Sequence, residues 1–277
     1  MKTTEKVLSV LEQNKDDFVS GEDIAALHDI SRNAVWKAVN ELRNRGYAIE
    51  AVSNKGYRLS RNSDIVSVEG IRACLPADLK DIADKTQVFD TIGSTSDLAK
   101  ELAVKGADHG TCVISLSQSG GRGRKDHSFF SPSGGLYMSM ILKPQYIPYG
   151  RSDLITGFIG LCVCKAILEL TGQQPVIKGI NDLYINDRKI CGILIESGSE
   201  FDSDTLQWIV AGIGINFDSD INDFPNDIKD VAASLFRPGK ATVSKNELAA
   251  RIIGNVFSGN CPGEDELIKE LRDCRKE

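Results

Sequence analysis

The chain has 277 residues, of which 41% are hydrophobic and 26% charged, a composition typical of a globular protein with one large and one small domain. Its formal net charge of -6 excludes a general electrostatic attraction to nucleic acid or to an anionic membrane, so any basic site must be local. The seven cysteines lack zinc-binding spacing and the N-terminus lacks a long apolar segment, so we predict a cytoplasmic protein with reduced thiols and no membrane span.

The N-terminal part has the pattern of a small DNA-binding module. Apolar residues at helical spacing predict three short helices, beginning near Thr4, Ser20 and Ser31. Ser31 is a suitable cap for the third helix, and Gly46 is a natural stop. The alternating segments YAIEAV and YRL flank residues 53–56, which predicts a β-hairpin with glycine at its turn. Three helices followed by a hairpin indicate a winged helix-turn-helix.

Charge is unevenly distributed along this module. Residues 31–61 contain seven Lys or Arg and two acids, whereas residues 16–30 contain five acids and no Lys or Arg. This pattern favours a third helix that enters the DNA major groove and a hairpin that contacts phosphate. The predicted DNA-binding residues are Ser31, Arg32, Asn33, Lys37, Lys55 and Arg58. The alternative is a solvated helix face in a protein-binding module. Because one copy would make few phosphate contacts, we expect a dimer.

From about residue 86 the chain alternates between predicted strands and helices. One helix is predicted to begin at Ser94, and another, which is buried, spans residues 154–171. The segments VIKGI, LYI, KICGILIES and LQWIVAGIGINF are separated by short turns, such as that at residues 185–188, so neighbouring strands can pair as antiparallel hairpins. The pattern predicts an α+β fold with a mixed, largely antiparallel sheet.

The segment QSGGRGRKD, residues 118–126, places three glycines beside three cations. It contains no G-x-x-x-x-G-K-[ST] phosphate loop, and Gly121-x-Gly123 is followed by Asp126 where a dinucleotide-binding fingerprint requires glycine or alanine. A flexible linker is one alternative. We instead predict a loop that closes over an anion, because glycines at a strand end permit left-handed turns and exposed backbone N–H groups.

Three segments, GGRGRKDHSFFSPSGGLYMSMIL, KGINDLYINDRKICGILIES and GIGIN, follow the winged helix-turn-helix, and together they resemble the bacterial bifunctional biotin protein ligase and biotin-operon repressor. The resemblance implies a DNA-binding domain at residues 1–62, a linker at 63–70 and a class II synthetase-like biotin/lipoate ligase domain at 71–277. Such a protein forms biotinyl-5′-adenylate from biotin and ATP with Mg²⁺. It then transfers biotin to a lysine of a biotin carboxyl carrier protein. The implied partners also include operator DNA and a second copy, which joins on adenylate binding.

The resemblance implies a role for individual residues. The biotin contacts would be Ser94, Thr95, Ser96, Gln118, Gly121, Arg122, Lys178 and Gly192. The nucleotide contacts would be Arg124, Lys125, Phe129, Asn181 and Asn216. The catalytic set would be Lys178, Arg122, Arg124 and Asp182. In this set Lys178 offsets negative charge between the biotin carboxylate and the α-phosphate, and Asp182 helps to hold Mg²⁺.

Three features differ from the family pattern. Asp126 stands where the loop usually has glycine, which places an anion in an anion-binding loop. Gly179 and Ile180 replace the Trp and Pro that usually follow the catalytic lysine. We also expect no small β-barrel domain after the ligase core, because the sequence stops at LIKELRDCRKE.

Two other functions stay open. One is a biotin-sensing repressor with weak or lost ligase activity, and the other is a lipoate-protein ligase, which would not need the polar group expected around the biotin ring. Biotin-dependent ATP–pyrophosphate exchange distinguishes a ligase from a sensor. Single residues also have structural alternatives: Lys178 as an edge-strand lysine, Asp182 as a turn residue and Phe129 as a core residue.

Overall fold

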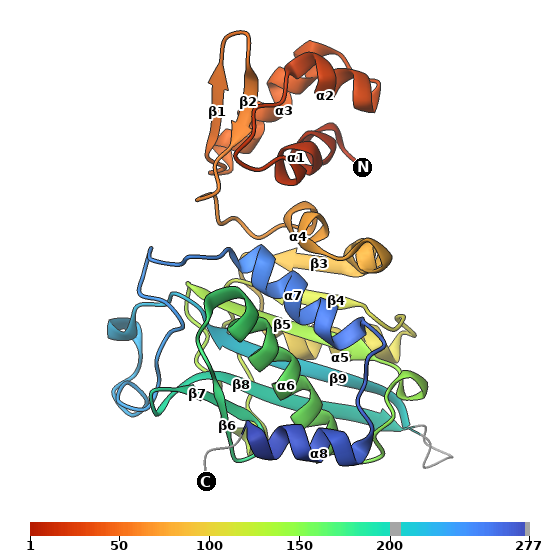
Figure 1. Ribbon diagram of the computed structural model, residues 1–277, viewed down its shortest axis with the longest axis vertical. Coiled ribbons are helices and arrows are strands. Elements are labelled where there is room, and N and C mark those ends of the chain that lie inside the picture. Colours follow the sequence, from red (N-terminus) through yellow and green to blue (C-terminus); the bar gives the residue numbers. More distant parts are fainter. Residues whose placement is uncertain (200–205, 275–277) are drawn as a thin grey trace. The chain divides into compact units, whose positions relative to one another are not determined.

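The computed structural model describes residues 1–199 and 206–274, except for the side chain of Asp126, so the predicted anion in the loop lies outside the described part. The chain folds as two compact units (Figure 1). Unit 1 comprises Met1–Leu75 and Ser244–Ala250, and unit 2 comprises Pro76–Val243 together with the chain from Arg251 onward. The functional domain boundaries stay predictions; the segment predicted as a linker, residues 63–70, belongs to unit 1.

Unit 1 begins with the three predicted helices and the predicted hairpin. Its elements are α1 (Thr3–Gln13), α2 (Gly21–His28), α3 (Arg32–Asn44), β1 (Ile49–Val52), β2 (Gly56–Leu59) and α4 (Val68–Cys74). The hydroxyl of Ser20 accepts a hydrogen bond from the N–H of Asp23 at 3.0 Å, and that of Ser31 accepts one from Ala34 at 3.1 Å. These side chains cap α2 and α3. The predicted winged helix-turn-helix is confirmed.

Gly56 fixes the hairpin of unit 1 against the segment that precedes α2. Its φ is +102°, and a Cβ there would meet the carbonyl oxygen of Val19 at 2.1 Å. The N–H of Tyr57 donates to that same oxygen at 2.9 Å. Only glycine fits this close approach, because any side chain would collide with the backbone.

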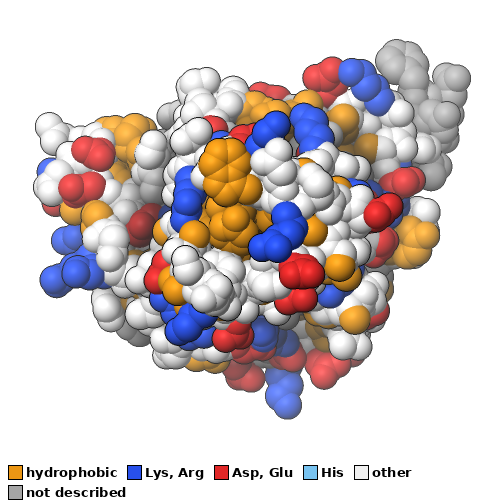
Figure 2. All heavy atoms as spheres, turned by 90° about the horizontal axis from the view of Figure 1, so that it is seen from above, with side chains coloured by type: hydrophobic (Ala, Val, Ile, Leu, Met, Phe, Trp, Pro, Cys, Tyr) orange, Lys and Arg blue, Asp and Glu red, His pale blue; other side chains and the backbone are white. Residues whose placement is uncertain are grey.

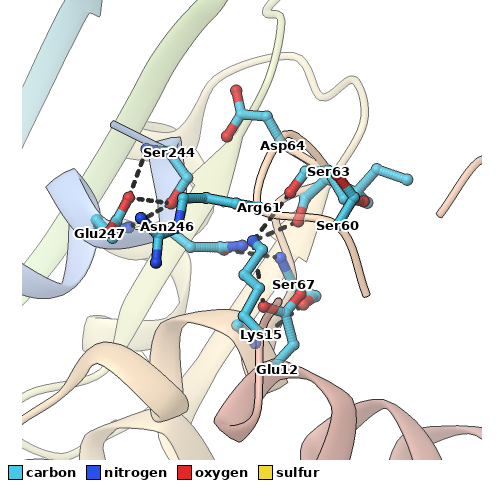
Figure 3. Close-up of polar contacts among 12 residues, drawn as sticks. Glu12, Lys15, Ser60, Arg61, Ser63, Asp64, Ser67, Ser244, Asn246 and Glu247 are labelled. Atoms are coloured by element: carbon cyan, nitrogen blue, oxygen red, sulfur yellow. Dashed lines mark hydrogen bonds and ion pairs between the residues drawn. The ribbon is translucent and has the colours of Figure 1, made fainter. Parts of the chain in front are cut away.

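Residues 63–70 are held by the first turn of α7 (Lys245–Phe257), which belongs to unit 1 (Figure 3). The buried Asn246 side chain accepts a hydrogen bond from the N–H of Ser67 at 3.1 Å and donates one to the carbonyl of Ile65 at 2.9 Å. Lys245 pairs with Asp64 at 2.8 Å. The segment predicted as a linker is therefore an ordered part of unit 1.

Unit 2 is built on a sheet that has seven strands among the described residues. Their order is β3 (Thr86–Phe89), β4 (Cys112–Ser115), β5 (Gly135–Leu142), β9 (Leu206–Asn216), β8 (Arg188–Ser199), β7 (Asp182–Ile185) and β6 (Val176–Lys178). β3 and β4 are parallel, and the other neighbours are antiparallel. The predicted mixed, largely antiparallel sheet is confirmed.

Two helices cover opposite faces of this sheet: α5 (Thr95–Val104) and α6 (Ser152–Thr171). A Cβ at Gly212 would meet the hydroxyl of Ser96 in α5 at 2.6 Å. A Cβ at Gly160 in α6 would instead lie 3.6 Å from Cδ1 of Ile193. Ile193 pairs with Ile213, so their side chains lie on the same face of the sheet. Gly212 is the neighbour of Ile213 and faces the other way, because successive residues of a strand point to opposite faces. The helices α5 and α6 therefore lie on opposite faces of the sheet.

The helix α6 is largely buried in unit 2. It is long and apolar enough to cross a membrane by length and composition, with a mean hydropathy of 1.8, but 72% of its apolar window is buried inside the protein. A Cβ at Gly157 would meet Cδ1 of Leu271 in α8 (Glu264–Asp273) at 2.6 Å, so α8 packs closely on it (Figure 1). Short 3₁₀ segments complete the described chain: Ala77–Lys85, Arg124–Asp126, Pro144–Tyr146 and Ile221–Asp223.

Candidate active site

A cavity of about 350 Å³ opens on the face of the sheet that carries α5. Its floor has little side-chain cover, because Gly192 and Gly214 face each other on β8 and β9, and Gly212 lies two residues before Gly214. The ring of Phe129 lies over this floor: a Cβ would meet the ring at 2.8 Å from Gly192 and at 2.6 Å from Gly214. The glycines of CGIL and GIGIN therefore create the space, and β-strand alternation places them on one face.

Hydroxyl and amide groups form a buried network on the Gly212 side of the cavity. The side-chain oxygen of Gln118 accepts hydrogen bonds from the backbone N–H of Thr95 at 2.8 Å and from its hydroxyl at 3.1 Å. The hydroxyl of Ser139 donates to that of Thr95 at 2.8 Å and lies 3.1 Å from that of Ser96. The sequence reasoning missed Ser139, which is fully buried; a serine in the middle of the apolar run LYMSMIL was the available signal. The network offers neutral donors and acceptors in a site screened from water.

The glycine loop is an ordered, narrow hairpin. The N–H of Gly123 donates to the carbonyl of His127 at 2.7 Å, and that of Phe129 donates to the carbonyl of Gly121 at 2.9 Å. A Cβ at Gly121 would meet the carbonyl oxygen of Phe129 at 2.3 Å, so glycine is required there. Lys125 adopts the left-handed conformation with a φ of +53°. The loop therefore places its cations at the cavity by its own backbone pairing.

Arg122 belongs to a network of alternating charges at the edge of the cavity. Its guanidinium lies 3.0 Å from a carboxylate oxygen of Asp97 and 3.5 Å from one of Glu196. Lys100 bridges the same two carboxylates at 3.0 and 2.8 Å. Burial alone would lower the pKa of Lys100, but the hydrogen bonds to Glu196 and Asp97 outweigh it, so the pKa is raised. The network holds Arg122 in place beside the loop.

A second charged group lies on the Gly192 side of the cavity. The ammonium of Lys189 pairs with Asp182 at 2.8 Å and lies 5.7 Å from the centre of the Phe129 ring. Asn181 donates to the same carboxylate at 2.9 Å and accepts from Arg124 at 3.3 Å. Lys189 was missed by the sequence reasoning, because its place at the cavity depends on the pairing of β7 with β8 and on the register shift between Leu183 and Tyr184.

The structure brings most of the predicted ligase residues to this one cavity. Its lining includes Thr95, Ser96, Gln118, Arg122, Arg124, Lys125, Phe129, Asn181, Asp182 and Gly192. Ser94, Gly121, Lys178 and Asn216 are not among its lining residues. Ser94 instead caps α5 by accepting a hydrogen bond from the N–H of Asp97 at 3.3 Å.

Lys178 lies on β6, at the edge of the sheet. Its ammonium pairs with Asp187 at 2.8 Å and lies 4.8 Å from the centre of the Tyr184 ring. This placement agrees with the alternative of an edge-strand lysine, and the catalytic role stays a prediction. Gly179, which departs from the family pattern, has a φ of +64° in the turn between β6 and β7, a conformation that suits glycine.

Asn216 is buried at the end of β9, and its side chain is only half satisfied. The amide nitrogen donates to the carbonyl of Ala233 at 3.1 Å. The amide oxygen is buried and has no hydrogen-bond partner among the described residues. An unpaired buried acceptor is costly, and a ligand that brings an N–H group would satisfy it.

The predicted DNA-binding residues of unit 1 lie at its surface. Arg32, Asn33 and Lys37 are exposed on α3, after the cap Ser31. On the hairpin, Lys55 and Arg58 both approach the ring of Phe18, at 5.7 and 4.6 Å from its centre. Figure 2 shows one face of the molecule, on which hydrophobic side chains lie among Lys and Arg side chains.

Comparisons with known proteins match both units. The Biotin/lipoate A/B protein ligase family matches residues 88–216, and an HTH domain matches residues 3–58. A bifunctional ligase/repressor BirA from Bacillus subtilis (strain 168) is 38% identical over 230 residues, which cover 83% of this chain and 69% of that protein. The BirA of Escherichia coli (strain K12) is 30% identical over 201 residues, covering 72% of this chain and 60% of that protein.

Two solved structures share the fold. A biotin protein ligase from Aquifex aeolicus in complex with biotin and ATP has a TM-score of 0.58 and 23% identity, over 69% of this chain and 78% of that chain. A biotin protein ligase from Leishmania major in complex with biotinyl-5-AMP has a TM-score of 0.56 and 21% identity, over 69% of this chain and 81% of that chain.

Proposed function

We infer that this chain, which belongs to the biotin/lipoate A/B protein ligase family and within it to the bifunctional ligase/repressors, is an ATP-dependent biotin protein ligase. The observation that carries the proposal is the single cavity in which a buried neutral polar network and a cationic loop both line the wall. A substrate for such a cavity has a polar, uncharged head and an anionic reacting end. Biotin, with its ureido ring and carboxylate, has both, and ATP supplies the second anion.

The first step joins two anions. A carboxylate oxygen of biotin attacks the α-phosphorus of ATP, and the bond from that phosphorus to the bridging oxygen breaks, releasing pyrophosphate. At 4 Å a unit charge pair is worth about 1 kcal/mol in water and about 4 kcal/mol at an effective dielectric of 20, so cations act most strongly once solvent is excluded. We propose that Arg122, Arg124 and Lys125 provide this stabilisation from the loop.

Two further nucleotide contacts follow from the same proposal. Phe129 lies over the glycine floor and would stack on the purine, and the unpaired amide oxygen of Asn216 would accept a hydrogen bond from the adenine amino group. Lys178 would have to exchange Asp187 for the substrate phosphate in order to act between the carboxylate and the α-phosphate. The closed loop would then protect the mixed anhydride from water.

The residues present fit a Mg²⁺ ion that arrives with the nucleotide. The described chain has no cluster of three or more His, Cys, Asp or Glu that could hold a metal. Mg²⁺ is commonly bound through one or two carboxylates together with substrate phosphates and water. We propose that Asp182, the acidic residue in the cavity wall whose side chain is described, contributes this carboxylate, while the ion would neutralise phosphate charge.

In the second step the amine of an acceptor lysine attacks the carbonyl carbon of the adenylate, AMP leaves and the amine loses a proton. The proposed acceptor is a lysine of a biotin carboxyl carrier protein, and the proposed location is the cytoplasm. For unit 1 we propose operator binding through α3 and the hairpin, with a homodimer that forms when the adenylate is bound.

Biotin-dependent ATP–pyrophosphate exchange tests the ligase proposal. We expect exchange with biotin and Mg²⁺ but not with lipoate, and a loss of about 100-fold in Lys178→Ala, because one preorganised electrostatic contact is typically worth that much. Lys105→Ala, an exposed lysine paired with Glu101, is the matched control. No exchange at any Mg²⁺ concentration, from protein that still binds biotin, would favour the sensing repressor; exchange with lipoate alone would favour the lipoate ligase.

A further inference from the structure

The helix α3 presents two chemically different faces. Val35, Val39 and Leu42 are buried in the core of unit 1. The opposite face carries Arg32, Asn33 and Lys37. It also carries Trp36, which is 55% exposed. Residues three and four apart on a helix are neighbours, so Trp36 lies on the same stripe as Arg32 and Asn33. The chain thus displays an indole among the residues proposed to face DNA bases.

A single exposed apolar residue usually needs no explanation. Leu27 on α2 is an example, with 66% exposure. The surroundings of Trp36 differ, because the first turn of α3 has no acidic residue; Glu22 of α2 lies 3.9 Å from Arg32, and the stripe still keeps a net positive charge from Arg32 and Lys37. A surface that joins an indole to cations and an amide complements a polyanion that also displays apolar groups.

Duplex DNA has that chemistry. The phosphates carry the charge, and in the major groove the C5-methyl group of thymine is the apolar group on the base edges. In a helix-turn-helix the second helix of the motif lies in the major groove with its N-terminal residues at the bases. Trp36 is in the second turn of α3, within reach of the same bases as Arg32 and Asn33.

We propose that Trp36 is a specificity residue that contacts thymine methyl groups in the operator. The proposal rests on the repressor function proposed above and adds the base feature that unit 1 selects. Burial of one methyl group against the indole should change affinity about four- to tenfold per thymine contacted. The cations around Trp36 would contribute affinity for any sequence, and Trp36 would make that affinity depend on thymine.

The test removes only the methyl groups. An operator is first selected from a random duplex pool with the full wild-type chain in the presence of biotin and ATP. Each thymine is then replaced by deoxyuridine, and dissociation constants are measured by fluorescence anisotropy for the wild type, Trp36→Ala, Trp36→Leu and the control Leu27→Ala. We expect about four- to tenfold weaker binding at one or two uracil positions for the wild type and Leu27→Ala, and no such loss for Trp36→Ala.

Trp36→Leu keeps an apolar side chain and should retain part of the uracil effect; circular dichroism checks that both variants are folded. An equal uracil effect in Trp36→Ala and the wild type would overturn the proposal, as would the absence of any uracil-sensitive thymine. A loss of dimer in Trp36→Ala, seen by sedimentation with the uracil effect unchanged, would assign the indole to a protein interface instead. If the wild type enriches no sequence, the repressor function itself fails.

Discussion

The ammonium of Lys189 lies at the cavity, where it could pair with a phosphate oxygen of a bound nucleotide. It pairs with Asp182 at 2.8 Å and lies near Phe129, so it sits between the proposed metal carboxylate and the proposed purine platform. We expect such a cation to bind the polyphosphate rather than the ureido ring. Its contribution should therefore appear in nucleotide binding.

We predict that Lys189→Ala raises the KM for ATP about tenfold, because a partly screened cation contact is worth about 1 to 4 kcal/mol, and leaves the KM for biotin within about twofold. Lys189→Arg should recover part of the loss, and Lys105→Ala should behave as wild type. Steady-state exchange kinetics measure both constants. A change in the KM for biotin alone would contradict the assignment of this lysine to the nucleotide.

Gly214 is the glycine of the floor that lies closest to the ring of Phe129. A Cβ there would meet Cε1 of the ring at 2.6 Å, a distance that forces the ring to move. We predict that Gly214→Ala raises the KM for ATP and that Phe129→Ala added to it has little further effect, because both changes remove the same stacking surface. Gly150→Ala, which has open space around its Cβ, is the control. Additive losses in the double variant would show that the two residues act separately.

At the scale of elements, the contact between residues 63–70 and α7 joins chain segments 181 positions apart. Asn246 is 1% exposed and satisfies one backbone N–H and one backbone carbonyl. A buried polar group left without its partner costs about 1–3 kcal/mol. The first turn of α7 therefore stabilises unit 1 although it lies far in sequence from residues 1–75.

We predict that Asn246→Ala lowers the free energy of unfolding of unit 1 by about 2–4 kcal/mol, since two backbone groups lose a partner. In a Trp208→Phe background, urea unfolding followed by the fluorescence of Trp36 reports on unit 1. In a Trp36→Phe background, the fluorescence of Trp208 reports on unit 2. Asn222→Ala, in the exposed 3₁₀ segment Ile221–Asp223 of unit 2, is a control that should leave the stability of unit 1 unchanged. Equal stability of Asn246→Ala and wild type would mean that this contact contributes nothing.

The elements that the sequence predicted are those defined by nearby residues. Ser31 as a cap, the start of the second helix near Ser20, the glycine at the hairpin and the alternating strands are all local signals, and each appears in the structure. The Asn246 contact could not be predicted, because no local pattern indicates a partner so distant along the chain. Ser139 and Lys189 were missed because their roles depend on which strands are neighbours. The ordered backbone pairing of the glycine loop was likewise invisible in its composition.

For the whole molecule, the presence of a DNA-binding unit and a ligase unit in one chain predicts that the reaction intermediate controls operator binding. Such coupling is typically worth about 1–3 kcal/mol, or about 5- to 150-fold in affinity. We expect biotin with ATP to tighten operator binding by a factor in this range, and to increase the dimer fraction measured by sedimentation. Biotin alone, or ATP alone, is the control. Operator affinity that is the same with and without both substrates would contradict the coupling.

Formation of the adenylate by the isolated chain tests most directly whether the cavity on β8 and β9 is a ligase site. The full protein is incubated with biotin, Mg²⁺ and ATP labelled in its α-phosphate, and the products are separated by chromatography. We expect a labelled biotinyl-5′-adenylate that requires biotin and falls by about 100-fold in Arg122→Ala, because the loop cation stabilises the charge that develops at the α-phosphate. Protein that binds biotin and ATP but yields no labelled adenylate would contradict the claim that this cavity is a ligase site.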